Sequence, residues 1–407
     1  MDLGQKLKFL RNNQNANQHE IVEGICSVSY YSKIENGNVV PNEEILHLLA
    51  ERFGVTVEEL TQTNEVVNDQ VIREAENIYN LIKEDQTAAK EAYQAFLKEF
   101  ENSTDPGMKL IISLIELRFA LGFSTLEEAE EKFQEAESLQ DFNSLKIMPL
   151  YNRVCGLYYY ATGNYDAALE LYLGLANSLN YPYKADIHYE LSLVYSRKDN
   201  MYKSIQHLEK ALNAYLQEMN FKQCTVCYFL LGINYFKMKN YDEAIDYYYR
   251  IEKVIKDDKD LLRKVYNNIG LAFEKKQELE KAIHYYQQSL FIEGKHNVKT
   301  MYALAELYLR MENKEKTAYY IAKGEIEAKK FNLKEYIIKF HVLLLRLREE
   351  DVQEYLEKVA IPFFKEKNDT DALIKYHVIL SDYYSKNKQY KQAYFKIKNA
   401  LDMKGGV

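Results

Sequence analysis

One pattern, repeated three times along the chain, sets the strongest limit on how the chain can fold. It occurs as YNRVCGLYYYATGNYDAALELYLGLA at 151–176, CYFLLGINYFKMKNYDEAIDYYYRI at 227–251 and VYNNIGLAFEKKQELEKAIHYYQQSL at 265–290. Each copy has a glycine, an aromatic residue three positions later and an alanine twelve positions later. We expect the glycine and the alanine to let two paired helices approach closely, with the aromatic residue filling the groove between them. The pattern therefore predicts stacked helix pairs.

The glycine serves as a register position, and equivalent residues recur every 35 to 40 positions along most of the chain. This spacing is slightly longer than the roughly 34 residues of a tetratricopeptide repeat, which indicates longer helices or turns. The equivalent residues are Asn77, Leu117, Gly156, Ser192, Gly232, Gly270, Ala305, Leu343 and Ser381. We therefore expect about nine tetratricopeptide-type repeats that form a right-handed solenoid over residues 71–403.

The composition agrees with an all-α fold. The 407 residues include only 5 Pro and 15 Gly, so long helices can run without interruption. No apolar run approaches the roughly 20 residues that span a bilayer, and the first residues, MDLGQKLKFLRNNQ, lack the apolar core of a signal peptide. We therefore expect a cytoplasmic protein without a membrane partner.

Residues 1–62 follow a different pattern and are predicted to form a separate domain, joined to the repeats by a linker at 63–70. Five short segments each begin at a residue such as Asn, Ser, Pro or Thr, and most end at Gly or Asn, as helix caps require. Their apolar residues would form one compact core of five helices. These residues are Leu3, Leu7, Leu10, Ile21, Ile25, Ile34, Ile45, Leu48, Leu49, Phe53, Val55 and Leu60.

Within this domain, the stretch NQHEIVEGICSVSYYSKIENG predicts a helix, a turn and a second helix. Gln18 stands at the start of the first helix, and Ser27 would cap a second helix from about Val28 to Glu35. This is the arrangement in which the second helix enters the major groove of DNA. Helical spacing turns Tyr31 and Ile34 toward the core. The residues left toward solvent or DNA are Val28, Ser29, Tyr30, Ser32 and Lys33.

The segment resembles the bacterial Xre/Cro-type helix-turn-helix family. The likeness rests on SKIENG at 32–37, Pro41, LLAERFGV at 48–55 and EEL at 58–60. It implies that Gln18 approaches a phosphate and that the second helix faces base edges or backbone. The residues of that helix and its cap to which this role is assigned are Ser27, Val28, Ser29, Tyr30 and Lys33, with Val28 standing where a polar residue is common.

The net charge of residues 1–60 is −4, from five Lys and Arg against nine Asp and Glu. Because neutralisation of phosphates supplies most non-specific affinity for DNA, we expect one domain alone to bind weakly and to need dimerisation. The alternative is that the domain contacts only protein.

The inner helices of a tetratricopeptide solenoid line a concave groove that can hold an extended peptide. Positions three before, one after and four after the register residue would face this groove, and they are mainly apolar or aromatic, so a short hydrophobic peptide is the expected ligand. The predicted peptide contacts are Arg153, Tyr160, Tyr189, Phe229, Asn267, Glu274 and Tyr302. Asn267 stands out because a side-chain amide can donate to and accept from one peptide unit. Its alternative role is a hydrogen bond between helices.

The combination of the two parts resembles the peptide-sensing regulators of Gram-positive bacteria that include Rap, Rgg, NprR, PlcR and PrgX, most of all the NprR and PlcR branch. The resemblance implies a quorum-sensing transcription factor that binds DNA as a homodimer and takes up a re-imported signalling peptide. It also implies that an Asn three before the register residue holds the peptide backbone, which Asn267 matches. The alternative is a Rap-like protein that binds a response regulator and inhibits a phosphorelay.

Nothing in the sequence indicates enzymatic chemistry. It has no glycine-rich phosphate loop, no HExxH and no convincing nucleophile and base, and its eight His are scattered singly. Cys224 and Cys227 form a CxxC on an apolar helix, and we expect small core residues there rather than a redox or zinc site. We therefore expect no catalytic residue, metal or cofactor.

Overall fold

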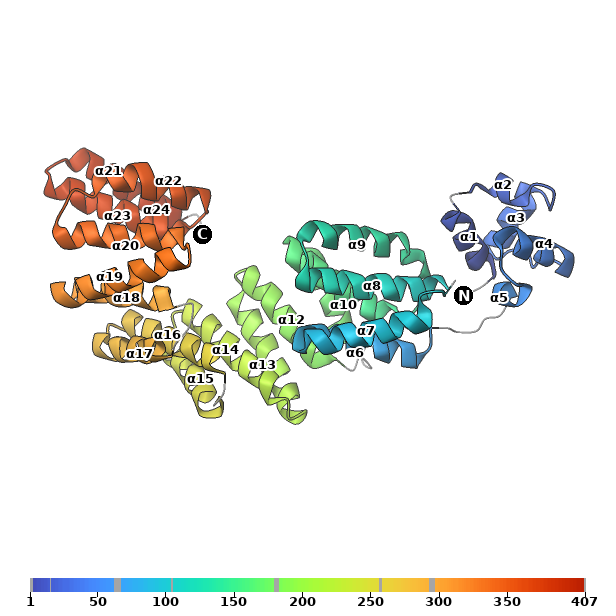
Figure 1. The fold of residues 1–407 in the computed structure, drawn as a ribbon, viewed down its shortest axis with the longest axis horizontal. Coiled ribbons are helices and arrows are strands. Elements are labelled where there is room, and N and C mark those ends of the chain that lie inside the picture. The colour runs from blue at the N-terminus through green and yellow to red at the C-terminus, as the bar shows by residue number, and fades with distance from the viewer. Residues whose placement is uncertain are drawn as a thin grey trace. The chain divides into compact units, whose positions relative to one another are not determined.

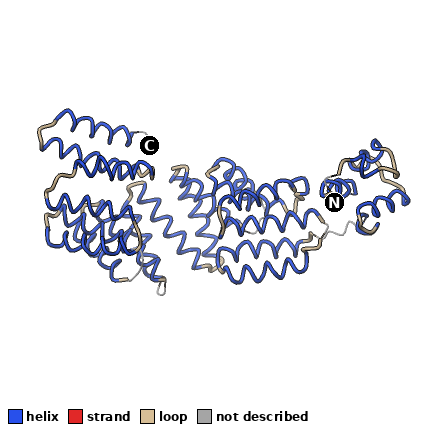
Figure 2. The backbone as a smooth tube through the Cα atoms, turned by 45° about the horizontal axis from the view of Figure 1, so that its top comes forward, coloured by secondary structure: helices blue, strands red, loops and turns tan. Residues whose placement is uncertain are grey.

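The computed structural model describes residues 3–14, 16–61, 67–103, 105–178, 183–255, 258–292 and 297–405. These residues form helices joined by turns, without any strand (Figure 2). The predicted all-α class is thereby confirmed. Part of the predicted linker at 63–70, namely residues 63–66, lies outside the described residues.

The N-terminal domain has the five helices that the sequence predicted (Figure 1). They are α1 (Leu3–Asn13), α2 (Gln18–Val22), α3 (Val28–Glu35), α4 (Glu43–Phe53) and α5 (Val57–Thr61). Ser27 caps α3, since its hydroxyl accepts a hydrogen bond from the Tyr30 backbone N–H at 3.2 Å. Tyr31 and Ile34 lie in the domain core, as predicted.

The buried face of α4 differs from the prediction at one residue. Leu48 is 38% exposed, so its assignment to the core was wrong, and Leu46 is buried instead, at 8% exposure. The buried stripe of α4 runs through Leu46, Leu49 and Phe53, the i, i+3 and i+7 positions of one helical face, and Leu48 falls outside it.

The rest of the described chain forms nine helix pairs, distributed over two compact units. The first unit, Met1–Gln217, contains the N-terminal domain and four pairs; the second, Glu218–Val407, contains five. The first four pairs are α6 (Asp69–Glu84) with α7 (Gln86–Phe100), α8 (Pro106–Phe123) with α9 (Leu126–Ser138), α10 (Met148–Thr162) with α11 (Tyr165–Asn177), and α12 (Lys184–Arg197) with α13 (Met201–Gln217).

The second unit begins with α14 (Phe221–Lys237) and α15 (Tyr241–Val254), α16 (Lys259–Lys275) and α17 (Leu279–Phe291), and α18 (Asn297–Arg310) and α19 (Lys314–Lys330). In the next pair, α20 (Lys334–Arg348) is followed by α21 (Gln353–Tyr355), a π-helical turn (Leu356–Ala360) and α22 (Ile361–Glu366). The last pair is α23 (Thr370–Lys386) and α24 (Tyr390–Gly405). Every predicted register residue lies in the first helix of a pair.

At the register glycines, a side chain of the second helix packs directly against the backbone of the first helix. A Cβ added at Gly156 would lie 2.6 Å from Cε1 of Tyr172, and one added at Gly270 would lie 2.7 Å from Cδ1 of Tyr286. These tyrosines stand sixteen positions after the glycine and are buried. The sequence analysis did not assign this role to them. The alanines twelve positions after the glycine are Ala168, Ala244 and Ala282, all fully buried as predicted.

The turn inside most pairs places one residue in the left-handed region, seven positions after the register residue. Gly163 (φ 84°) does so at no steric cost, whereas the other repeats use larger residues. These are Asp199, Lys239, Gln277, Glu312 and Lys388. The constant position of this residue shows that these six turns share one geometry.

Cys224 and Cys227 are buried on α14 and form no disulfide bond, so the prediction of small core residues is confirmed. Across the described ranges, no helix combines the length and apolarity needed to cross a membrane, and no group of three or more His, Cys, Asp or Glu side chains is arranged to hold a metal ion.

The glycine contacts lead to a stability prediction. Gly156→Ala and Gly270→Ala should each destabilise the protein by about 1–2 kcal/mol, because overpacking against the buried tyrosine outweighs the gain of about 1 kcal/mol in helix propensity. The matched control is Gly174→Ala in α11, where an added Cβ has no neighbour within 4 Å. Urea unfolding should show a lower midpoint for the two register variants and an unchanged or higher one for the control. Equal midpoints for all three variants would contradict this explanation.

Candidate functional site

The outer face of α3 carries the residues that the sequence assigned to DNA. Ser29 and Lys33 are exposed, Val28 is 37% exposed and Tyr30 is half-buried. Ser27 is exposed as well, although its hydroxyl is engaged in capping the helix. The predicted residues of α3 and its cap are therefore wholly or partly accessible, and Lys33 contributes a positive charge among them.

The half-buried side chain of Gln18 is held by a polar cluster of the N-terminal domain. Its Nε2 donates to Oε2 of Glu35 at 2.7 Å, and Nε of Arg11 donates to the other carboxylate oxygen at 2.7 Å. Glu35 is buried, and hydrogen bonding to this carboxylate raises the pKa of Arg11. The cluster joins α1, α2 and α3. The contact of Gln18 with a phosphate stays a prediction. The amide nitrogen of Gln18 would have to donate to the phosphate and to Glu35 at the same time.

Arg153 is the first predicted peptide contact, and it lies in a buried ionic cluster. The side chain is 2% exposed and forms ion pairs with Glu76 at 2.9 Å, Asp186 at 3.1 Å and Glu190 at 3.7 Å. The ring of Tyr79 covers the guanidinium at 4.0 Å. Contact of Arg153 with a peptide stays a prediction that would require these pairs to open, at the cost of buried unpaired charge.

Tyr160 and Tyr189 are the other two predicted contacts in the first unit, and both are half-buried. The Tyr160 hydroxyl accepts a hydrogen bond from Nε of Arg197 at 3.3 Å. The ammonium of Lys83 lies 4.3 Å from the ring centre of Tyr189. Both side chains therefore already interact with cations of the same unit, Tyr160 through its hydroxyl and Tyr189 through its ring, and their contact with a peptide remains a prediction.

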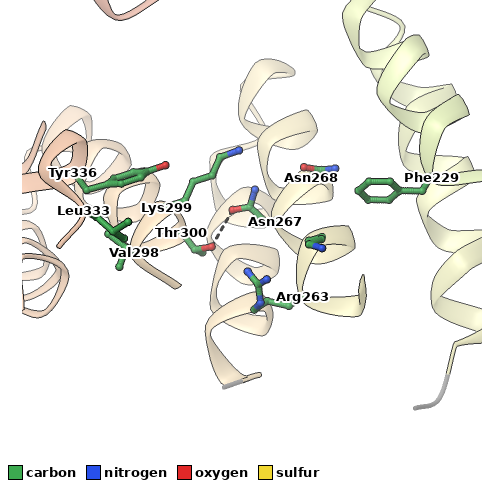
Figure 3. A pocket seen from close by; sticks show the side chains of 10 residues that line it. Phe229, Arg263, Asn267, Asn268, Val298, Lys299, Thr300, Leu333 and Tyr336 are labelled. Atoms are coloured by element: carbon green, nitrogen blue, oxygen red, sulfur yellow. Dashed lines mark hydrogen bonds between the residues drawn. The ribbon is translucent and has the colours of Figure 1, made fainter. Parts of the chain in front are cut away.

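In the second unit, Phe229 and Asn267 line a single pocket of about 370 Å³ (Figure 3). Figure 3 shows the rings of Phe229 and Tyr336 at opposite sides of it, with Asn267, Asn268 and Lys299 between them. The residues that line the pocket and were missed by the sequence analysis are Arg263, Lys264, Asn268, Val298, Lys299, Thr300, Leu333 and Tyr336. The pocket thus combines apolar walls with side-chain amides and cations.

Asn267 is buried and has one side-chain partner. Its Oδ1 accepts a hydrogen bond from the Thr300 hydroxyl at 2.9 Å, which joins α16 to α18 (Figure 3). This is the interhelical bond considered as the alternative role of Asn267. The amide nitrogen has no acceptor among the described residues, so its two N–H donors remain open to a ligand in the pocket. The same side chain can thus be fixed by Thr300 and still donate to a peptide carbonyl.

The cations of the pocket outnumber the nearby carboxylates. None of the residues that line the pocket is acidic. Asp260 stands one turn before Arg263 and Lys264 on α16, and its carboxylate accepts from both side chains, each at 2.6 Å. These two donors lower the pKa of Asp260 to about 2, so it stays ionised at neutral pH.

Glu274 and Tyr302 lie outside this pocket and take part in polar contacts between helices. Glu274 accepts from the Tyr286 hydroxyl at 2.9 Å and from Arg310 at 2.7 Å. The Tyr302 hydroxyl accepts from Nζ of Lys375 at 2.6 Å, and Lys375 also pairs with Glu306. Burial lowers the pKa of Lys375 and raises that of Tyr302 well above its usual value. The structure therefore does not bring all four predicted residues of the second unit into one pocket.

The missed cations follow the register at other offsets. Arg263 and Lys264 stand seven and six positions before Gly270, and Lys299 stands six positions before Ala305. These offsets lie one helical turn before the positions that the sequence analysis used, on the same side of the first helix. Extending the rule by one turn toward the N-terminus of each first helix would have found them.

Comparison with known families identifies both parts of the chain. Residues 4–66 match the helix-turn-helix domain family, and residues 183–257 and 226–292 match a tetratricopeptide repeat family. These matches agree with the five-helix domain and with the central helix pairs.

Individual proteins resemble the chain over most of its length. Transcriptional activator NprA of Geobacillus stearothermophilus is 28% identical over 405 residues, which cover 92% of this chain and 96% of that protein. Response regulator aspartate phosphatase I of Bacillus subtilis is 24% identical over 300 residues, 68% of this chain and 75% of its own length.

The fold is also that of a solved regulator, the quorum sensor NprR. Its apo form from B. thuringiensis superimposes with a TM-score of 0.71 at 22% identity, over 83% of this chain and 99% of that one. NprR in complex with its cognate peptide NprX superimposes with a TM-score of 0.56 at 21% identity, over 82% and 99% of the two chains.

A helix-turn-helix domain, an array of tetratricopeptide-like pairs and whole-chain similarity to NprA occur here in one protein. The chain is therefore similar, in both of its parts and along nearly its whole length, to a regulator of the group that the sequence resembles, which includes Rap, Rgg, NprR, PlcR and PrgX.

Proposed function

We propose that this protein is a cytoplasmic quorum-sensing transcriptional regulator that binds DNA as a homodimer and is switched by a short signalling peptide. The observation that carries the proposal is the pocket in which Asn267 offers its amide donors between apolar walls. The exposed face of α3 supports the DNA-binding part of it. The similarity to an activator along nearly the whole chain supports the combination of the two roles.

The proposed switch is a shift between conformations of the repeat array. A stack of helix pairs has a curvature that is the sum of small rotations at each interface, so a peptide bridging several first helices can change it. Half-sites on DNA lie about one helical turn apart, roughly 34 Å, so two α3 helices of a dimer dock together only at a suitable separation. A peptide that alters this separation would control DNA binding.

The last helix supports the proposed dimer. The second helix of the last pair, α24, exposes Tyr390, Tyr394 and Leu401, spaced at four and seven positions along the helix. Such a stripe of large apolar side chains is typical of a surface that packs against another helix. A second copy of the chain offers the same stripe in a symmetric arrangement.

A second candidate function is a Rap-like one, in which the repeats bind a response regulator and inhibit a phosphorelay. The similarity to response regulator aspartate phosphatase I over two thirds of the chain favours it. The net negative charge of residues 1–60 also suits a domain that binds protein. Selection of DNA fragments discriminates between the two functions.

We predict that Lys33→Glu weakens binding to an operator by tenfold or more, because the new carboxylate would face the DNA backbone; a tenfold loss equals about 1.4 kcal/mol. Genomic fragments selected by the full-length protein would be tested by gel shift at fixed salt. Lys98→Glu on α7 is the matched control, since it makes the same charge change at an exposed residue far from α3 in the sequence. If the wild type enriches no symmetric site, with or without peptide, the response-regulator function is favoured.

The dimer proposal is tested with Tyr394→Glu. A charge in the middle of the apolar stripe should shift the protein to monomer in sedimentation velocity, since an unpaired carboxylate would be buried at the interface. Tyr202→Glu on α13 is the control, because Tyr202 is an equally exposed tyrosine on a second helix. If both variants sediment like the wild type, α24 is not the dimer surface.

Peptide binding is tested by retention of a synthetic heptapeptide library on the protein, measured by mass spectrometry. Asn267→Ala should lower retention about tenfold, because a hydrogen bond to a buried peptide group contributes about 1–1.5 kcal/mol. The control Asn77→Ala removes an exposed Asn from a first helix of the other unit and should have no effect. If both variants retain the same amount of peptide, Asn267 does not contact the peptide.

A further inference from the structure

The pocket between α16, α18 and α20 holds more positive charge than its surroundings balance. Arg263, Lys264 and Lys299 contribute three cations to its lining, and Asp260 is the one carboxylate that pairs with any of them among the described residues. The local excess is therefore two positive charges. An apolar pocket with such an excess favours an anionic ligand group over a neutral or cationic one.

Arg263 is the most enclosed of the three cations. It is only 3% exposed, and its guanidinium has one described hydrogen-bond partner, Asp260, whose own side chain is mostly exposed. A guanidinium has five N–H donors and a permanent positive charge. The Arg263 side chain lines the pocket together with those of Asn267 and Asn268, so this charge lies at the pocket wall.

Lys299 is the cation of the pocket that combines exposure with the lack of a described ion pair. Its side chain is exposed, and its ammonium has no ion-pair partner in the described part of the chain. Figure 3 shows it extending from α18 to the same side of the pocket as the amides of Asn267 and Asn268. A carboxylate placed there would meet the ammonium and the amide donors together. These are the groups that fix a carboxylate by charge-assisted hydrogen bonds.

We propose that this pocket receives a carboxylate of the signalling peptide, supplied either by the peptide's C-terminus or by an acidic side chain. The inference rests on the proposed function and specifies the ligand class: a mainly hydrophobic peptide with one acidic group. Phe229, Val298 and Tyr336 hold the neighbouring apolar side chains. The cations repel a peptide amino terminus, so the peptide lies with its amino end away from this pocket.

The test uses four synthetic pools of hydrophobic heptapeptides on the full-length protein. The pools carry either one Glu or one Gln at a varied position, each with a free or an amidated C-terminus. Retained peptide is quantified by mass spectrometry at constant ionic strength. If the pocket binds the C-terminal carboxylate, both free-acid pools should be retained at least tenfold more than the amidated pools. If it binds an acidic side chain, both Glu pools should be retained at least tenfold more than the Gln pools.

Two variants test whether the preference for acidic peptides depends on Lys299. Lys299→Gln should reduce the advantage of the acidic pools about tenfold, and the exposure of Lys299 means that this variant should fold normally. Lys253→Gln, at an exposed lysine of α15, is the matched control and should behave as the wild type.

The outcomes separate the inference from the function on which it rests. Equal retention of the neutral amidated pool and the acidic pools, unchanged by Lys299→Gln, would overturn the carboxylate assignment and leave peptide binding in place. An acidic preference that survives Lys299→Gln would place the carboxylate elsewhere and overturn the assignment as well. Retention of no pool would overturn peptide binding itself.

Discussion

The structure of the repeats depends on the close approach of two helices at a small residue. At Gly156, Gly232 and Gly270, a tyrosine of the second helix occupies the space where a Cβ would stand. This contact fixes the rotation of the first helix about its axis, because only one face can receive the tyrosine ring. Once that rotation is fixed, the opposite face is fixed as well, and with it the residues that a ligand can meet.

Polar contacts then join successive first helices about one repeat apart. Asn267 accepts from Thr300, and Glu274 accepts from Arg310, 33 and 36 positions later in the chain. The hydroxyl of Tyr160 is bonded by Arg197, 37 positions later. Such pairs satisfy polar groups on the inner face and couple neighbouring repeats, so a ligand that competes for them can alter how two repeats meet. This is the physical basis on which peptide binding would change the array.

In the N-terminal domain, contacts between residues close in the sequence fix the position of α3. The capping hydroxyl of Ser27 starts α3, the burial of Tyr31 and Ile34 orients it, and the Arg11–Glu35–Gln18 cluster joins it to α1 and α2. The outcome is an α3 whose outer face is exposed and carries Lys33. The domain is net acidic, so the proposed DNA binding would depend on this local placement of charge more than on the total.

The sequence by itself determined the helix pairs, their register and the five-helix domain, because these depend on contacts between residues close in the chain. The spacing of Gly270 and Ala282 predicted that the helices carrying them pack together, and Asn267 was placed correctly on the first helix of its repeat. Only the tertiary structure decided which inward positions stay open. Arg153 is enclosed by carboxylates from α6 and α12, up to 77 positions away, and no local pattern indicates such a cluster. The excess charge of the pocket has the same origin, since Arg263 and Lys299 come from different repeats and meet only when α16 and α18 stack.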